Sequence, residues 1–161
     1  MKLMSKVLLA AVIGSLCMVA GATAFATQGN STVTPLAMGT LTGAVHSTTS
    51  VTGGRVSVQA KGALSVIVSQ LTLPPGGTSG WHSHAGPHFE VVNQGTLTEI
   101  NAKGCKTETM QAGQASYDGK PSDIVNAVNR GSDPLVVTQT FLVPKGTLPR
   151  IDQPAPPNCP T

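Results

Sequence analysis

Three of the chain's four histidines, His82, His84 and His88, fall within seven positions, and no other part of the sequence has a comparable cluster of metal-binding side chains. Alternate side chains of an extended strand share a face, so His82 and His84 point to the same side. Gly86-Pro87 predicts a turn, after which His88 opens the next strand. We therefore expect the three imidazoles to converge on one divalent metal ion. Imidazole accepts Zn, Fe, Mn, Ni and Cu, so the identity of the ion stays open.

The spacing around these histidines follows a known pattern. Intervals of five, one, three and six residues separate Gly76, His82, His84, His88 and Gly95. The stretch resembles the first signature of the cupin superfamily, written G(x)5HxH(x)3–4E(x)6G, and the resemblance extends over about residues 55–147. It implies an all-β double-stranded β-helix, a small barrel of the jelly-roll type whose interior holds a metal.

One position departs from that signature, because His88 stands where the family usually has glutamate. Glu90 lies two residues further on and faces the same side of a regular strand. We interpret His88 as the third metal ligand and Glu90 as a residue behind the ligands or an alternate ligand. Glu90 is also the best candidate for a catalytic base, on proximity alone.

The second cupin signature is damaged in this chain. Val125 stands where a fourth ligand, a histidine, is expected, and Asn126 beside it is either a weak oxygen ligand or an ordinary polar residue. Three neutral imidazoles leave a divalent ion with a charge near +2, which would acidify bound water and favour anionic ligands. The alternative is a metal-free barrel in which the histidines only form hydrogen bonds.

The first 26 residues have the layout of a signal peptide. Two lysines precede the apolar run 7–20, which is too short to span a bilayer comfortably, and small residues follow it. We predict cleavage after Ala26, with Ala24 as the competing site. The mature protein would be secreted or periplasmic, without stable membrane insertion.

The mature chain of about 135 residues suits one domain. Short β-branched runs separated by Gly, Pro and Asn predict an all-β fold, and "FEVVNQ" and "TLTEIN" flank Gly95 like a hairpin. We divide the chain into a signal peptide (1–26), a weakly patterned extension (27–54), a cupin barrel (55–147) and a Pro-rich tail (148–161). The mature net charge near +1, with no basic stripe, excludes a nucleic-acid partner.

Two cysteines, Cys105 and Cys159, remain after removal of the signal. In an exported protein such a pair can form a disulfide, which would attach the Pro-rich tail to the barrel. Closing a loop of this length contributes ~4 kcal/mol in the chain-entropy model. Two free thiols are the alternative.

Two functional interpretations follow. The first is an exported metal-binding cupin-domain protein that binds or transforms a small, by preference anionic, molecule. The second is a non-catalytic barrel, with or without metal, that binds a ligand or has a structural role. Whether the protein is an enzyme stays open, and so does a homodimer.

Overall fold

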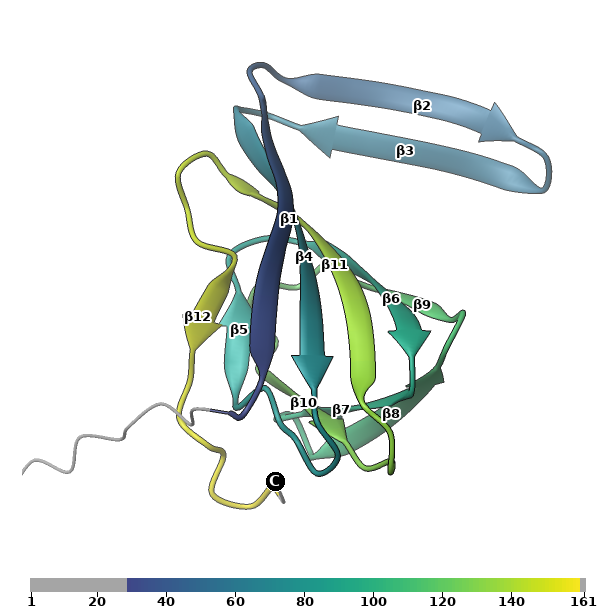
Figure 1. Cartoon of the computed structure of the whole chain (residues 1–161). Helices are drawn as coiled ribbons and strands as arrows, with labels where there is room; N and C mark the ends of the chain where they lie inside the picture. The colour runs from purple at the N-terminus through teal and green to yellow at the C-terminus, as the bar shows by residue number, and fades with distance from the viewer. Residues whose placement is uncertain (1–28, 160–161) are drawn as a thin grey trace, which may run out of the picture.

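The structure is a computed structural model that describes residues 29–159 (Figure 1). The predicted signal peptide lies outside these residues. Within them the chain forms twelve strands and no helix, which confirms the all-β class. The strands are β1 (Thr32–Leu41), β2 (Val45–Val51), β3 (Gly54–Ala60), β4 (Leu64–Leu73), β5 (His82–His84), β6 (His88–Gln94), β7 (Thr96–Asn101), β8 (Lys106–Gln111), β9 (Ala115–Asp118), β10 (Val125–Asn129), β11 (Leu135–Pro144) and β12 (Arg150–Asp152).

Ten strands form two five-stranded sheets that enclose the interior of the domain. One sheet has the order β1-β4-β11-β6-β9 and the other β12-β5-β10-β7-β8, with every neighbouring pair antiparallel. From β4 to β12 consecutive strands alternate between the sheets, except that β7 and β8 are neighbours in one sheet, and this arrangement is that of a jelly roll. This order supports the predicted double-stranded β-helix.

The apolar core fills one half of the space between the sheets. Side chains of β11 alternate between buried and partly exposed along its length, because successive residues point to opposite faces. The inward residues of several strands meet in one cluster, which consists of Leu71, Leu73, Val92, Leu97, Met110, Ala127, Leu135 and Val137.

The chain changes sheets at Gly95, and this corrects the predicted hairpin. β6 and β7 belong to different sheets, so they do not pair with each other. Gly95 has φ of +79°, and a Cβ there would lie 2.9 Å from the carbonyl oxygen of Pro134. The position is a tight corner that favours glycine, which a sequence pattern does not distinguish from a hairpin turn.

The barrel extends beyond the predicted limits of 55–147 at both ends. β1 pairs along its length with β4, and β12 pairs with β5. Between β1 and β4, the chain forms the β2–β3 hairpin, whose two strands pair only with each other. Figure 1 shows this hairpin protruding from the barrel.

The predicted disulfide is present and attaches the tail to the barrel. The Cα atoms of Cys105 and Cys159 are 5.2 Å apart in the bonded pair. Cys159 packs against a second buried cluster, formed by Trp81, Ile100 and Val128. The tail therefore covers the outer face of the β5–β10–β7 sheet.

No helix in the described part of the chain is long and apolar enough to cross a membrane.

Candidate metal centre and its pocket

The other half of the interior is polar, and β5 and β6 supply most of it. His82, His84, His88 and Glu90 are each no more than 5% exposed. β5 lies between β12 and β10, opposite Arg150 on one side and Val125 on the other. This pairing fixes the alternation of β5, so His82 and His84 line the interior cavity together.

The rings of His82, His84 and His88 lie close together in the interior. The ring centroids of His82 and His84 are 4.8 Å apart, and those of His84 and His88 are 4.1 Å apart. Phe141 packs against His88, with ring centroids 5.0 Å apart and nearly parallel planes. Apolar packing therefore restricts the orientation of the rings.

The side chains that could share one ion differ from the predicted set. Ligand atoms of His84, His88 and Asp118 all lie within 4.8 Å of one another, whereas His82 is outside this group. Asp118 ends β9 and is the register partner of His88 on β6. The prediction missed Asp118 because the register of two strands 30 positions apart brings it to the site, and no local motif marks it.

His82 nevertheless lies beside this group in an orientation that suits a ligand. Its Nδ1 is 2.8 Å from the carbonyl oxygen of Gly80, and this bond requires the proton on Nδ1. Nε2 is then the free acceptor of the ring. Metal-bound histidines usually donate their other N–H to a carbonyl or carboxylate in this way.

Glu90 lies behind the ligands. Its Oε1 is 3.2 Å from Nε2 of His88 and accepts a 2.7 Å hydrogen bond from Nε2 of Gln139. Burial alone would raise the pKa of Glu90, but the bonds from His88 and Gln139 outweigh it and hold the pKa below its usual value. The carboxylate is therefore charged and orients His88. Its prediction as a catalytic base remains untested.

Two buried nitrogens at the centre of the group have no hydrogen-bond partner within the described residues. They are Nδ1 of His84 and Nδ1 of His88. Buried polar atoms without partners are rare in folded proteins, because each loses its bonds to water without replacement. Two imidazoles and a carboxylate form a donor set that divalent transition metals accept, so these residues fit an ion.

Burial keeps the imidazoles of His82 and His84 neutral. Burial, followed by repulsion from Arg150, lowers the pKa of His82 to about 4. Burial, followed by repulsion from His88 and His82, lowers the pKa of His84 to about 2. Neutral imidazole is the form that binds metal, so these two rings are ready to ligate at neutral pH.

Asp118 changes the expected charge of the centre. A divalent ion held by this carboxylate and by imidazoles would keep a net charge near +1, in place of the +2 expected for histidines alone. The acidification of bound water is then weaker than the sequence suggested.

The two residues from the damaged second signature occupy opposite faces of β10. Val125 is buried next to His82, in register with it. Asn126 points to the other face, where its Oδ1 accepts a 2.6 Å hydrogen bond from Thr78 Oγ1. Of the two earlier alternatives for Asn126, this position favours an ordinary buried polar residue.

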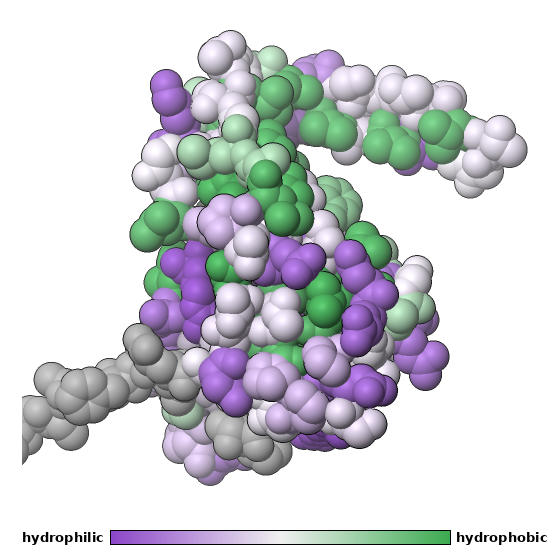
Figure 2. Space-filling view, viewed as in Figure 1, coloured by the Kyte–Doolittle hydropathy of each residue, from purple (hydrophilic) through white to green (hydrophobic). Residues whose placement is uncertain are grey.

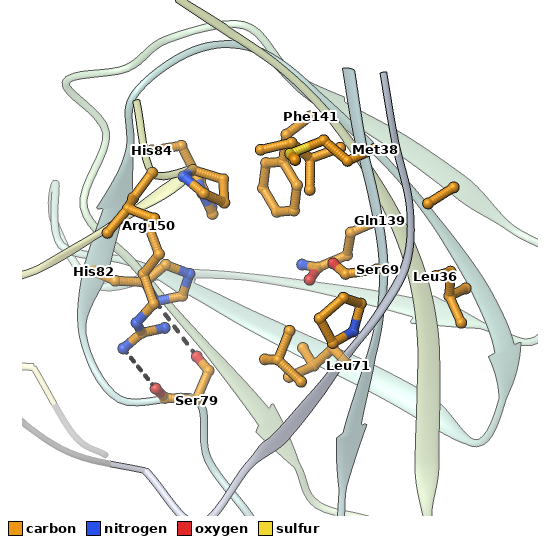
Figure 3. A pocket seen from close by; sticks show the side chains of 16 residues that line it. Leu36, Met38, Ser69, Leu71, Ser79, His82, His84, Gln139, Phe141 and Arg150 are labelled. Carbon is orange, nitrogen blue, oxygen red and sulfur yellow. Dashed lines mark hydrogen bonds between the residues drawn. The ribbon is translucent and has the colours of Figure 1, made fainter. Parts of the chain in front are cut away.

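A cavity of about 620 Å³ lies between β1 and β12 and leads inward to His82 and His84 (Figure 3). Most of its wall is apolar, and His82, His84 and Arg150 lie together on one side of it, as the figure shows. Arg150 donates to Oδ1 of Asp152 within β12 at 2.6 Å and to Ser79 O at 2.8 Å, and the second bond ties β12 to the segment before β5.

Comparison with solved structures yields cupin-domain proteins of low sequence identity. A cupin domain from Bordetella pertussis Tohama I is 20% identical, with a TM-score of 0.44 over 64% of this chain and 96% of that chain. A conserved protein with a double-stranded β-helix domain from Klebsiella pneumoniae is 17% identical, with a TM-score of 0.47 over 69% and 85%. A Cupin 2 conserved barrel protein from Salinispora arenicola is 18% identical, with a TM-score of 0.44, and the chain spans 64% of its length.

No protein-family model matches the sequence, and no curated protein matches it.

Proposed function

We propose that this chain, assigned to the cupin superfamily by its strand order, its first-signature spacing and its structural neighbours, is a metal-binding barrel that holds a small molecule beside the ion. The observation that carries the proposal is the meeting of His84, His88 and Asp118, with ligand atoms within 4.8 Å of one another, next to a cavity. His82 is the fourth proposed ligand, through Nε2.

The residues have separate tasks in this proposal. Asp118 and the imidazoles hold the ion, Glu90 orients His88, and Gly80 orients His82. A bound divalent ion would polarise a carbonyl or acidify a water molecule. Val125 occupies the fourth histidine's place, so this side of the centre is apolar.

Metal analysis of tag-free protein tests the proposal. We expect about one divalent ion per chain, and we expect its loss in His84→Ala and Asp118→Asn variants. His46→Ala is the matched control, because His46 is exposed on the hairpin and should not affect the metal content. Equal metal content in all four proteins would refute the site.

The alternative function is a metal-free binding barrel. It is favoured by the packing of Phe141 against His88, which would stabilise neutral rings without an ion. In that case the purified protein carries no stoichiometric metal, while the cavity still binds ligands.

Catalysis and location are separate proposals. Glu90 is already engaged by His88 and Gln139, which favours a binder over an enzyme that needs Glu90 as a free base. Turnover by the metal-loaded protein across a panel of small acids would reverse that preference.

The signal-peptide layout supports export, and mass spectrometry of the N-terminus of protein recovered outside the cytoplasm tests it.

A further inference from the structure

We infer that the cavity binds an amphipathic carboxylate, with the acid beside Arg150 and a bulky apolar body between β1 and β12. This deepens, and rests on, the proposed small-molecule binding. The inference comes from the unequal distribution of ionisable groups in the cavity, where Arg150, His82 and His84 occupy one side (Figure 3).

The apolar part of the cavity is too large for a small polar ligand. Its wall includes Ile67, Leu71 and Phe141 in the interior, and Met38 and Leu148 at the mouth. Met38 and Leu148 are each 78% exposed, more than any other large hydrophobic side chain of the described region. Exposed apolar side chains that rim a cavity mark a ligand site, because a ligand removes them from water.

The polar side of the cavity selects a negative charge. Arg150 is the only Lys or Arg among the described residues that line the cavity, and no Asp or Glu is among them. Arg150 forms an ion pair with Asp152, which does not line the cavity, and its bonds to Asp152 and Ser79 leave three of the five guanidinium N–H groups for a ligand. Such a fork, already fixed in place, suits a carboxylate.

The volume sets the size of the body. A cavity of about 620 Å³ lies within the range of sites for ring systems and medium-length chains. A very small diacid would leave most of the wall uncovered and would direct a second charge toward apolar side chains.

Calorimetry with decanoate, used below its micelle concentration, tests the proposal. Decanamide is the uncharged analogue and acetate the analogue without a body. We expect decanoate to bind at least tenfold more tightly than decanamide, and acetate not to bind. Equal binding of decanoate and decanamide would overturn the role of Arg150, and no binding of either would overturn the ligand class.

Three variants separate this proposal from the metal site. Arg150→Gln should weaken decanoate at least tenfold and leave decanamide unchanged, and Met38→Asp at the exposed mouth should weaken both. Arg55→Gln on the hairpin is the control. In Asp118→Asn protein the metal is lost but Arg150 remains, so decanoate should still bind; loss of binding there would contradict an acid held by Arg150.

A different observation, the amphipathic β2–β3 hairpin, supports a second proposal: we infer that it binds a second copy of this chain. Its register places Val51, Val56 and Val58 on one face, all of them exposed, and His46, Arg55 and Ser57 on the other. Figure 2 shows hydrophobic residues in a row along the lower edge of the protruding arm. A two-stranded hairpin is marginally stable in water, so this apolar face requires a cover.

The composition of the chain favours a second copy over another partner. Between residues 32 and 60 the only formally charged residue is Arg55, so nothing in this segment recruits an acidic or basic partner. The barrel exposes a second apolar patch, formed by Phe89, Val91 and Tyr117 on β6 and β9. A two-fold dimer in which each hairpin covers the patch of the other copy would bury both patches at once.

Edge-to-edge pairing through β1 is the less suitable geometry. Pro35 lacks a backbone donor, and the register of β1 shifts between Pro35 and Ala37. Both features disrupt a free sheet edge. The face of the hairpin is therefore the contact surface.

Light scattering coupled to gel filtration tests the second proposal. We expect a dimer for the natural sequence, monomer for Val56→Asp/Val58→Asp, and a weakened dimer for Val91→Asp. Arg55→Asp/Ser57→Asp places the same charges on the opposite face of the same strand and should stay dimeric. A monomeric natural protein, or a dimer unaffected by Val56→Asp/Val58→Asp, would contradict the proposal.

Discussion

The two halves of the barrel interior are built from the same strands, yet they have opposite chemistry. On β6, His88 and Glu90 lie in the polar half and Val92 in the apolar cluster; on β11, Gln139 is polar while Leu135 and Val137 are in the cluster. The alternation that buries every second residue is the same in both halves. Folding therefore requires only one half to be apolar, and the other half is free to carry polar side chains at a cost in stability.

The largest effect should come from the apolar half. Leu73 and Leu135 are fully buried in the cluster, so Leu73→Ala or Leu135→Ala should lower the free energy of unfolding by about 2–5 kcal/mol, through lost burial and the cavity left behind. Urea denaturation measures this change, and the metal content of the folded protein should not change. Leu148→Ala is the exposed control, with an expected change below about 0.5 kcal/mol.

A substitution in the polar half should instead weaken metal binding and leave the fold intact. Glu90→Gln removes the charge that orients His88, so we expect metal affinity to fall by about 10- to 100-fold while the protein stays folded. Competition with a chelator measures the affinity, and Glu108→Gln on the exposed β8 is the control. Unchanged affinity in the Glu90 variant would show that Glu90 has only a packing role.

An effect of similar size is expected from pH in the metal-free protein. The low pKa values of His82 and His84 mean that the unfolded chain binds protons below pH 6.5 while the native rings stay neutral. Their stability contribution is complete above pH 6.5 and is lost as pH falls toward 4, by about 1.4 kcal/mol per pH unit for each ring.

Glu99 opposes this loss. Burial raises its pKa to about 7, so between pH 4.5 and 7 the native state binds a proton that the unfolded chain releases. Its contribution is complete below pH 4.5 and is lost as pH rises through 7, which offsets one of the two histidines. Urea titrations with a chelator should give a net slope of about 1.4 kcal/mol per pH unit between pH 4.5 and 6.5, roughly doubled in Glu99→Gln. A flat profile in that variant would contradict neutral native histidines.

The smallest effect should come from Phe141, an apolar residue beside the histidines. Phe141 packs against the rings of both His84 and His88, with centroids 5.2 and 5.0 Å away. Phe141→Leu keeps an apolar side chain of similar size, so it should cost about 1 kcal/mol of stability. Because it frees the rings to rotate, it should weaken metal binding more than it weakens the fold. NMR of the histidine ring protons measures that freedom.

Local sequence patterns were sufficient for part of this architecture. The alternation of the strands predicts the all-β class, and the spacing of His82, His84 and His88 predicts their meeting, because both depend on neighbouring residues. Asp118 could not be found in this way, since it reaches the site through the register of β9 with β6. For the same reason the sequence does not predict that β1 belongs to the barrel, although its pairing with β4 is continuous except for one shift.

The disulfide has a consequence for the maturation of the cavity. β12, which carries Arg150, is followed by Gln153, whose backbone N–H donates a hydrogen bond to the carbonyl oxygen of Trp81. Cys159, which forms the disulfide with Cys105, lies seven residues after the end of β12. In a reducing compartment this last segment is held by hydrogen bonds and packing alone, so the cavity wall is less restrained there. Oxidation then fixes the final stretch, and ligand affinity should rise with it.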